Sequence, residues 1–302
     1  MRVLPAGATI AASFFCPPLF AQFTDPRSYT PGVVGTNDLE FDYTYARANA
    51  SIDTSLVVGS ATLELNKVDV SYTHNFSVLG HFAWVNVIVP YASLRGYVAE
   101  SNISGSTDGA GDSSLELAAL LKGGEALSAA QLASYEQTTC VGVSLTVSVP
   151  TGEYDADKVL NLGTHRWSFK PEMGVSYPFG PQQQWEVDGY INAYFFTDDT
   201  AYRGVEVLRQ EPLPGFEAHL SYTVSSSLWA SLDTRYAFRG ETVVDGLAQS
   251  NSQENLTVGM EAHWSPNSLH SLTLVFARAL VHVNAPNYTG VVVKYVYSWG
   301  NE

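Results

Sequence analysis

Charged and hydrogen-bonding side chains recur at every second position in several segments of the chain. Lys170 and Glu172 are spaced in this way, and so are Asp233 and Arg235. Residues two apart in a β-strand face the same side, so each pair would project into a common space. Facing acids and bases can line a hydrated path whose charges select solutes, or they can fill that path as mutual ion pairs. The candidate residues with this phase are Lys170, Glu172, Glu186, Asp188, Tyr190, His219, Asp233, Arg235, Glu261 and Lys294.

Enzymatic chemistry has weaker support in the sequence. His219 and Ser221 would share a strand face, but the chain contains neither a Gly-x-Ser-x-Gly nucleophile motif nor a His-Glu-x-x-His zinc motif. We therefore expect no enzyme and no catalytic residue, and a membrane hydrolase stays as an alternative. The spacing of Asp155, Asp157 and Asp198 matches no calcium-binding loop. We expect no metal site and no cofactor.

The elements that would position these residues show strict alternation. From Val141 to Val149 the odd positions are apolar, and from Cys140 to Ser148 the even positions are small or polar. This period of two is typical of a β-strand with two different faces. The same pattern predicts twelve strands, at residues 39–45, 68–72, 85–91, 115–121, 138–150, 167–177, 185–195, 216–222, 228–239, 254–264, 272–276 and 291–299.

The connections between these strands distinguish a membrane barrel from a soluble β-sandwich, which also alternates. Tight links occur at residues 77–80, 180–183, 225–227 and 266–268, whereas long polar links occur at residues 48–60, 100–112, 151–166, 198–214 and 240–253. Tight turns at one rim and long loops at the other are typical of outer-membrane barrels. The sequence therefore predicts an all-β fold, a transmembrane antiparallel up-and-down β-barrel of about 12 strands. Residues 123–137 are an exception, because Ser128 could cap a short helix there at the tight-turn rim.

Both ends of the chain indicate export to a membrane. Arg2 precedes an apolar stretch, and a cut after Ala21 would release a signal peptide, residues 1–21, from a barrel domain, residues 22–302. The last strand carries alternating apolar side chains up to Trp299 and resembles the signal read by the barrel assembly machinery. Tyrosine and tryptophan near other strand ends suit the lipid–water interface. We expect outer-membrane lipid and lipopolysaccharide as surroundings and the bacterial outer membrane as the location.

Composition excludes some partners and constraints. The formal net charge of −15 argues against nucleic acid as a partner, because a polyanion needs a basic face. Cys16 lies inside the predicted signal peptide, so Cys140 would have no internal disulfide partner. A closed barrel needs none, because every backbone group of its strands is paired.

A family resemblance covers essentially the whole chain after residue 21. Its central motif begins with Pro150-Thr151-Gly152-Glu153-Tyr154-Asp155 and continues through Asn161-Leu162-Gly163-Thr164 to Arg166-Trp167-Ser168-Phe169-Lys170-Pro171-Glu172. These residues resemble the family called MetA-pathway of phenol degradation, which consists of outer-membrane transporters. His165 departs from the family pattern, which more often has asparagine there. The resemblance implies uptake of aromatic or similar small compounds.

Together these observations predict a porin-like channel for passive uptake of small, aromatic or hydrophobic solutes. The ten residues named first would line its path. The polar segment 151–166 could fold over the mouth as a gate, with Asp155, Lys158, Asn161 and Arg166 as its candidate residues. A plugged structural barrel is an alternative with the same fold.

Overall fold

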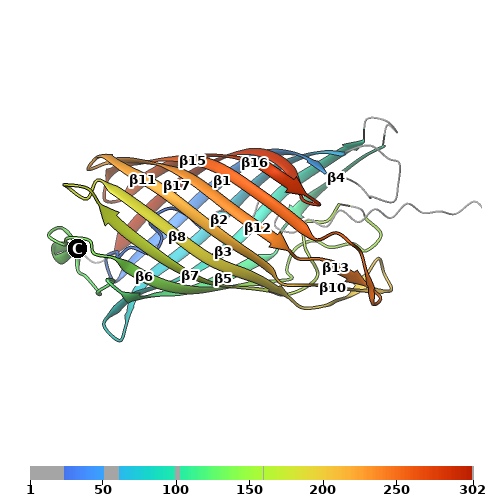
Figure 1. Ribbon diagram of the computed structural model, residues 1–302, viewed down its shortest axis with the longest axis horizontal. Coiled ribbons are helices and arrows are strands. Elements are labelled where there is room, and N and C mark those ends of the chain that lie inside the picture. Colours follow the sequence, from blue (N-terminus) through green and yellow to red (C-terminus); the bar gives the residue numbers. More distant parts are fainter. Residues whose placement is uncertain (1–23, 51–60, 99–102, 159, 301–302) are drawn as a thin grey trace, which may run out of the picture.

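The computed structural model describes residues 24–300 except 51–60, 99–102 and 159. The predicted signal peptide, residues 1–21, lies outside the described residues. The chain forms an antiparallel sheet that closes on itself, because its first strand, β1, pairs with both β2 and the last strand, β17 (Figure 1). The predicted up-and-down barrel is therefore confirmed.

The wall has twelve strand positions, as predicted, although thirteen strands build it. β4 and β5 pair with successive parts of β3 and are separated only by Gly111 and Asp112, so together they fill one position. The wall strands are β1 (Thr36–Ala50), β2 (Ala61–Val78), β3 (His81–Val98), β4 (Ile103–Ala110), β5 (Ser113–Lys122), β6 (Cys140–Val149), β7 (Ser168–Phe179), β8 (Trp185–Phe196), β11 (Leu213–Ser225), β12 (Leu228–Arg239), β15 (Gln253–Asn267), β16 (His270–Val283) and β17 (Asn287–Gly300).

The outer face of the barrel is apolar. Strand alternation places one side chain in two outward, and on β17 these are Val291, Val293, Tyr295, Tyr297 and Trp299, all exposed. Such a surface would be unfavourable in water and is stable against lipid. No helix in the described part of the chain is long and apolar enough to cross a bilayer.

The two rims differ as the connection lengths predict. Four hairpins, such as the one between β2 and β3 through Leu79 and Gly80, end at a rim that we call the tight-turn rim (left in Figure 1). Residues 123–139 also lie there, since Gly124 accepts a hydrogen bond from the Phe82 amide at 2.9 Å. This segment contains the predicted short helix, α1 (Ala129–Leu132), whose N-cap Ser128 forms a capping box.

The opposite rim, called the long-loop rim, holds structure that the sequence prediction missed. β9 (Asp199–Tyr202), β10 (Glu206–Gln210), β13 (Thr242–Val244) and β14 (Leu247–Ala248) form a second, small sheet inside two segments predicted as loops (right in Figure 1). β4 likewise occupies most of the predicted loop 100–112. β4 was missed because its small and polar residues do not alternate with apolar ones, and the strands of the small sheet were missed because each has at most five residues.

The barrel interior as the candidate functional site

The predicted path residues face the barrel interior, as their strand phase requires. Nine of the ten residues are less than 10% exposed, and the tenth, Lys170, has a side chain that is 12% exposed. They come from the neighbouring strands β7, β8, β11, β12, β15 and β17, so the tertiary structure brings them onto one continuous wall. Their part in a solute path remains a proposal.

The N-terminal segment, residues 24–33, lies inside the barrel against this wall. Tyr29 is 1% exposed, and its hydroxyl lies 3.0 Å from both Ser144 Oγ and Glu172 Oε1. Its ring fits because Gly142 and Gly174 have no side chain, and a Cβ at either position would overlap ring atoms of Tyr29. The two glycines therefore form a socket for this one residue.

Charged contacts hold the rest of the segment. Arg27 Nε donates to Ser221 Oγ at 2.8 Å, and the Arg27 amide donates to Asp188 Oδ2 at 3.2 Å. The Arg27 guanidinium lies 5.0 Å from the ring centroid of Trp229. On the other side, Lys294 Nζ donates to both carboxylate oxygens of Asp25, at 2.6 and 2.7 Å.

Several path residues are therefore partners of the N-terminal segment. Glu172 and Glu217 accept hydrogen bonds from the hydroxyl and the amide of Thr24, and Asn192 bridges the two carboxylates at 3.0 Å each. The ion-paired side chains of the wall and the folded-in segment 24–33 together occupy this part of the interior. The sequence left an open hydrated path and a filled one as alternatives; the contacts of residues 24–33 favour a filled one in this region.

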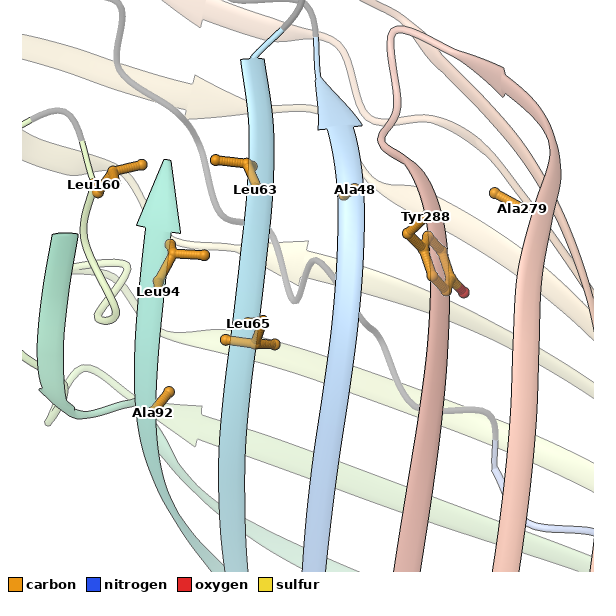
Figure 2. Packing of buried hydrophobic residues seen from close by; sticks show 8 residues of the cluster. All are labelled: Ala48, Leu63, Leu65, Ala92, Leu94, Leu160, Ala279 and Tyr288. Atoms are coloured by element: carbon orange, nitrogen blue, oxygen red, sulfur yellow. The ribbon is translucent and has the colours of Figure 1, made fainter. Parts of the chain in front are cut away.

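The interior changes character toward the long-loop rim. Along β2, the inward side chains Lys67 and Asp69 are followed by Leu65 and Leu63. Leu63 and Leu65 belong to what we call the inner apolar cluster (Figure 2). It consists of Ala48, Leu63, Leu65, Ala92, Leu94, Leu160, Ala279 and Tyr288.

Leu160 is the one member of this cluster that does not come from the wall. It belongs to residues 150–167, which contain the predicted gating loop 151–166, and is only 7% exposed, so the loop turns into the barrel (Figure 2). Gly96 and Gly105 leave space beside it, since a Cβ there would lie 3.2 and 3.7 Å from Leu160 Cδ1. The loop thus places an apolar side chain where an apolar solute could lie.

Asp112, at the break between β4 and β5, holds the base of this loop. Its Oδ1 accepts the amide of Gly152 at 2.9 Å, and its Oδ2 accepts the amide and the hydroxyl of Thr164 at 2.8 and 2.6 Å. Gly152 and Gly163 pass so close that a Cβ on Gly152 would lie 2.6 Å from Gly163 Cα. The central sequence motif is therefore the closed base of an inward loop. β4 pairs only with β3 among the described strands, and this loop runs beside its other edge.

The other predicted gate residues occupy different parts of the loop. Asp155, Lys158 and Asn161 form its exposed turn, where the Asn161 amide group donates to the backbone oxygens of Asp155 and Lys158. Arg166 is 2% exposed, and its guanidinium lies 4.2 Å from the ring centroid of Phe196. Burial lowers the pKa of Arg166 to about 10.

A third anchor joins the loop to the small sheet at the long-loop rim. His165 Nδ1 lies 2.7 Å from Asp199 Oδ1, and the Tyr154 hydroxyl donates to Asp199 Oδ2 at 3.1 Å. The rings of His165 and Tyr154 stack with centroids 4.7 Å apart. His165, at which the sequence departs from the family pattern, therefore has a structural part in holding the loop.

Three features of the site escaped the sequence analysis. The N-terminal segment has no periodic pattern, so nothing local indicates that it lies inside the barrel. Asp112 was placed in a loop, and its carboxylate binds Gly152 and Thr164, which lie 40 and 52 positions further along the chain. The apolar cluster left a signal, because Leu63 and Leu65 have the same phase as Lys67 and Asp69, but the predicted strand began only at residue 68.

Comparison with known protein families identifies the family of this chain. The family described as "Putative MetA-pathway of phenol degradation" matches residues 46–291, which includes the loop motif and most of the wall. The chain belongs to this family. This confirms the predicted resemblance. No curated protein matches the chain in sequence.

Solved structures support the fold. The COG4313 outer membrane channel from Pseudomonas putida F1 has a TM-score of 0.79 and 20% sequence identity, and the match covers 92% of this chain and 100% of that one. The β-domain of the Bordetella autotransporter BrkA follows with a TM-score of 0.52 and 8% identity, covering 87% and 99%. The transport unit of the autotransporter AIDA-I from Escherichia coli has a TM-score of 0.51 and 12% identity, covering 96% of each chain. At these identities, the likeness is one of fold.

Proposed function

We propose that this chain is an outer-membrane channel through which small apolar molecules, including aromatic ones, move down their gradient. The observation that carries the proposal is the inner apolar cluster, because its leucines offer an apolar solute a surface that an interior lined only by charges would lack. A pocket lined by apolar side chains binds apolar solutes by removing their surface from water. Membership of a phenol-degradation family and the fold shared with an outer membrane channel support the same proposal.

In this proposal the loop 150–167 is the gate and Leu160 is its moving part. Leu160 fills the pocket in the absence of solute, and an incoming apolar molecule takes its place. The ten interior residues named from the sequence line the onward path, and residues 24–33 must shift to let a solute pass. Export through a cleaved signal, insertion by the assembly machinery and contact with lipopolysaccharide complete the proposal for this location.

A plugged structural barrel is the second candidate, because residues 24–33 make so many contacts with the wall. A hydrolase is less well supported, since the Ser221 hydroxyl accepts a hydrogen bond from Arg27 and takes part in holding the N-terminal segment. The channel and the plugged barrel differ in whether an apolar solute finds a binding site inside the barrel.

The deciding experiment changes Leu160 and measures binding of 2-phenylethanol to the refolded mature chain by equilibrium dialysis. Leu160→Ala removes the side chain that competes with the solute, so affinity should rise several-fold, whereas Leu160→Asp places a charge in the pocket and should weaken binding. Val205→Ala, at an exposed position on the same rim, is the control and should leave affinity unchanged. Absence of binding by the unchanged protein and by all variants would favour the plugged barrel.

Conductance supplies a second readout of the same proposal. Single-channel recordings in planar bilayers with a lipopolysaccharide outer leaflet should show current steps that an aromatic solute blocks. In Leu160→Asp the block should require higher solute concentrations. Steps that no apolar solute alters would count against an apolar path.

A further inference from the structure

We propose that the preferred solute carries a positive charge: Asp42 and Thr44, next to the inner apolar cluster, form a subsite for the ammonium group of an aromatic or alkyl amine. This inference rests on the proposed function, because the apolar body of the amine would occupy the pocket described above. It adds the identity of the polar end, which neither the family nor the relatives indicate.

The position of the subsite follows from the register of the first two strands. Thr44 lies opposite Lys67, and the neighbouring inward pair is Ala46 opposite Leu65, a member of the apolar cluster. Inward positions along a strand are about 7 Å apart. An amine whose ring or chain lies against Leu65 would therefore bring its nitrogen to Thr44 and Asp42.

Both side chains are buried with hydrogen-bonding capacity left over. Asp42 is 5% exposed and Thr44 is 4% exposed. Asp42 Oδ1 and Thr44 Oγ1 meet no donor among the described residues, and the side-chain hydrogen bond of the Asp42 carboxyl is shared with another carboxyl group, that of Glu40. A buried polar atom left without a partner is unfavourable, so a donor that reaches both oxygens would be stabilised. An ammonium group has three donors and no acceptor, which suits this pair.

The lysines that flank Asp42 in the sheet hold other carboxylates. Lys67 Nζ lies 2.8 Å from Asp69 Oδ2, and Lys294 Nζ lies 2.6 Å from Asp25 Oδ1. These contacts explain why two neighbouring cations leave Asp42 Oδ1 without a hydrogen bond. Lys294 also interacts electrostatically with Asp42, but its ammonium group donates its hydrogen bonds to Asp25.

The surrounding charge excludes an anionic solute. Glu40 and Glu261 also interact electrostatically with Lys294, so five carboxylates share two lysines. The carboxylates are Asp25, Glu40, Asp42, Asp69 and Glu261, and the lysines are Lys67 and Lys294. A cluster with more carboxyl groups than lysines favours a cation over an anion. In the described residues, no group of three or more His, Cys, Asp or Glu side chains is arranged to hold a metal ion.

The test compares three probes that share a phenyl group and differ in the charge at the other end. The full mature chain, refolded in detergent, is dialysed against 2-phenylethylamine, 2-phenylethanol or 3-phenylpropionate. We expect the amine to bind about tenfold more tightly than the alcohol, and the carboxylate to bind most weakly. Asp42→Asn should abolish the preference for the amine while the affinity for the alcohol stays the same. Asp198→Asn removes the same charge from an exposed ion pair outside the barrel wall and should retain the preference.

The possible results separate this inference from the proposed function. Equal binding of amine and alcohol, or tighter binding of the carboxylate, would overturn the inference and leave the apolar channel standing. Failure of all three probes to bind would overturn both. If Asp42→Asn does not fold, as judged by heat-modifiable gel mobility, Thr44→Val replaces it and should reduce the preference for the amine. The preference of the unchanged protein decides the inference without any variant.

Discussion

Along β1 the interior face changes from Asp42 and Thr44 to Ala46 and Ala48 within six residues. The polar region near the tight-turn rim is filled by residues 24–33, which are held by ion pairs and hydrogen bonds. The apolar region near the long-loop rim is filled by Leu160, which is held by packing. Hydrogen bonds and ion pairs depend on direction and specify one partner, whereas an apolar contact accepts any apolar group of suitable size. The polar filling therefore suits a segment that stays bound in one place, and the apolar filling suits exchange with a solute.

The largest expected effect comes from breaking the polar filling alone. Gly174→Ala would place a Cβ that overlaps Tyr29 Cδ2 and lies 2.8 Å from Tyr190 Cδ1, while the backbone of β7 remains compatible with alanine. Overpacking of this kind costs about 1–3 kcal/mol, so the N-terminal segment should leave its socket more often. Single-channel conductance should rise several-fold.

Gly189→Ala is the matched control for this change. It lies on the adjacent strand β8 and faces outward, where a Cβ would meet nothing within 4 Å. Its conductance should equal that of the unchanged protein. If the two alanine variants conduct alike, the socket for Tyr29 does not control the plug.

A smaller effect should follow from loosening the base of the loop that carries Leu160. Asp112→Asn replaces one of two acceptor oxygens by a donor and leaves the amide of Gly152 or of Thr164 unsatisfied, at a cost of about 1–3 kcal/mol. The loop should then open more often, and the backbone beside Lys158, whose side chain is already exposed, should enter a protease more readily. Trypsin should cleave after Lys158 about tenfold faster than in the unchanged protein. A cleavage rate that does not change would show that packing of Leu160 alone holds the loop.

The smallest effect is expected from an ion pair outside both fillings. Arg209 Nε lies 2.8 Å from Asp198 Oδ2 at the long-loop rim, and both side chains are largely exposed. Such pairs contribute about 0–1 kcal/mol. Arg209→Gln should therefore change neither conductance nor the temperature at which the barrel loses its heat-modifiable mobility. A marked change in either would mean that the small sheet at this rim is coupled to the interior.

The wall and its facing were predictable because they depend on short-range patterns. From Val141 to Val149 alternation alone gives both the strand and its outward face, and the tight and long links give the two rims. Strand ends were less predictable: β2 runs from Ala61 to Val78, far beyond the alternating stretch. Its added residues include Leu63 and Leu65, which are apolar on the inward side. The rule of an apolar outer and polar inner face does not hold there.

What fills the interior was decided only by the tertiary structure. Tyr29 meets Ser144 and Glu172, which lie 115 and 143 positions away, and Lys294 meets Asp25 across 269 positions. Leu160 reaches the cluster from a loop whose base Asp112 closes. The sequence by itself determined a closed barrel with a charged inner wall, since strand phase is a local property. It could not determine the folded-in segment 24–33, the inward loop or the inner apolar cluster, because these contacts form only after closure has brought distant strands to face one common space.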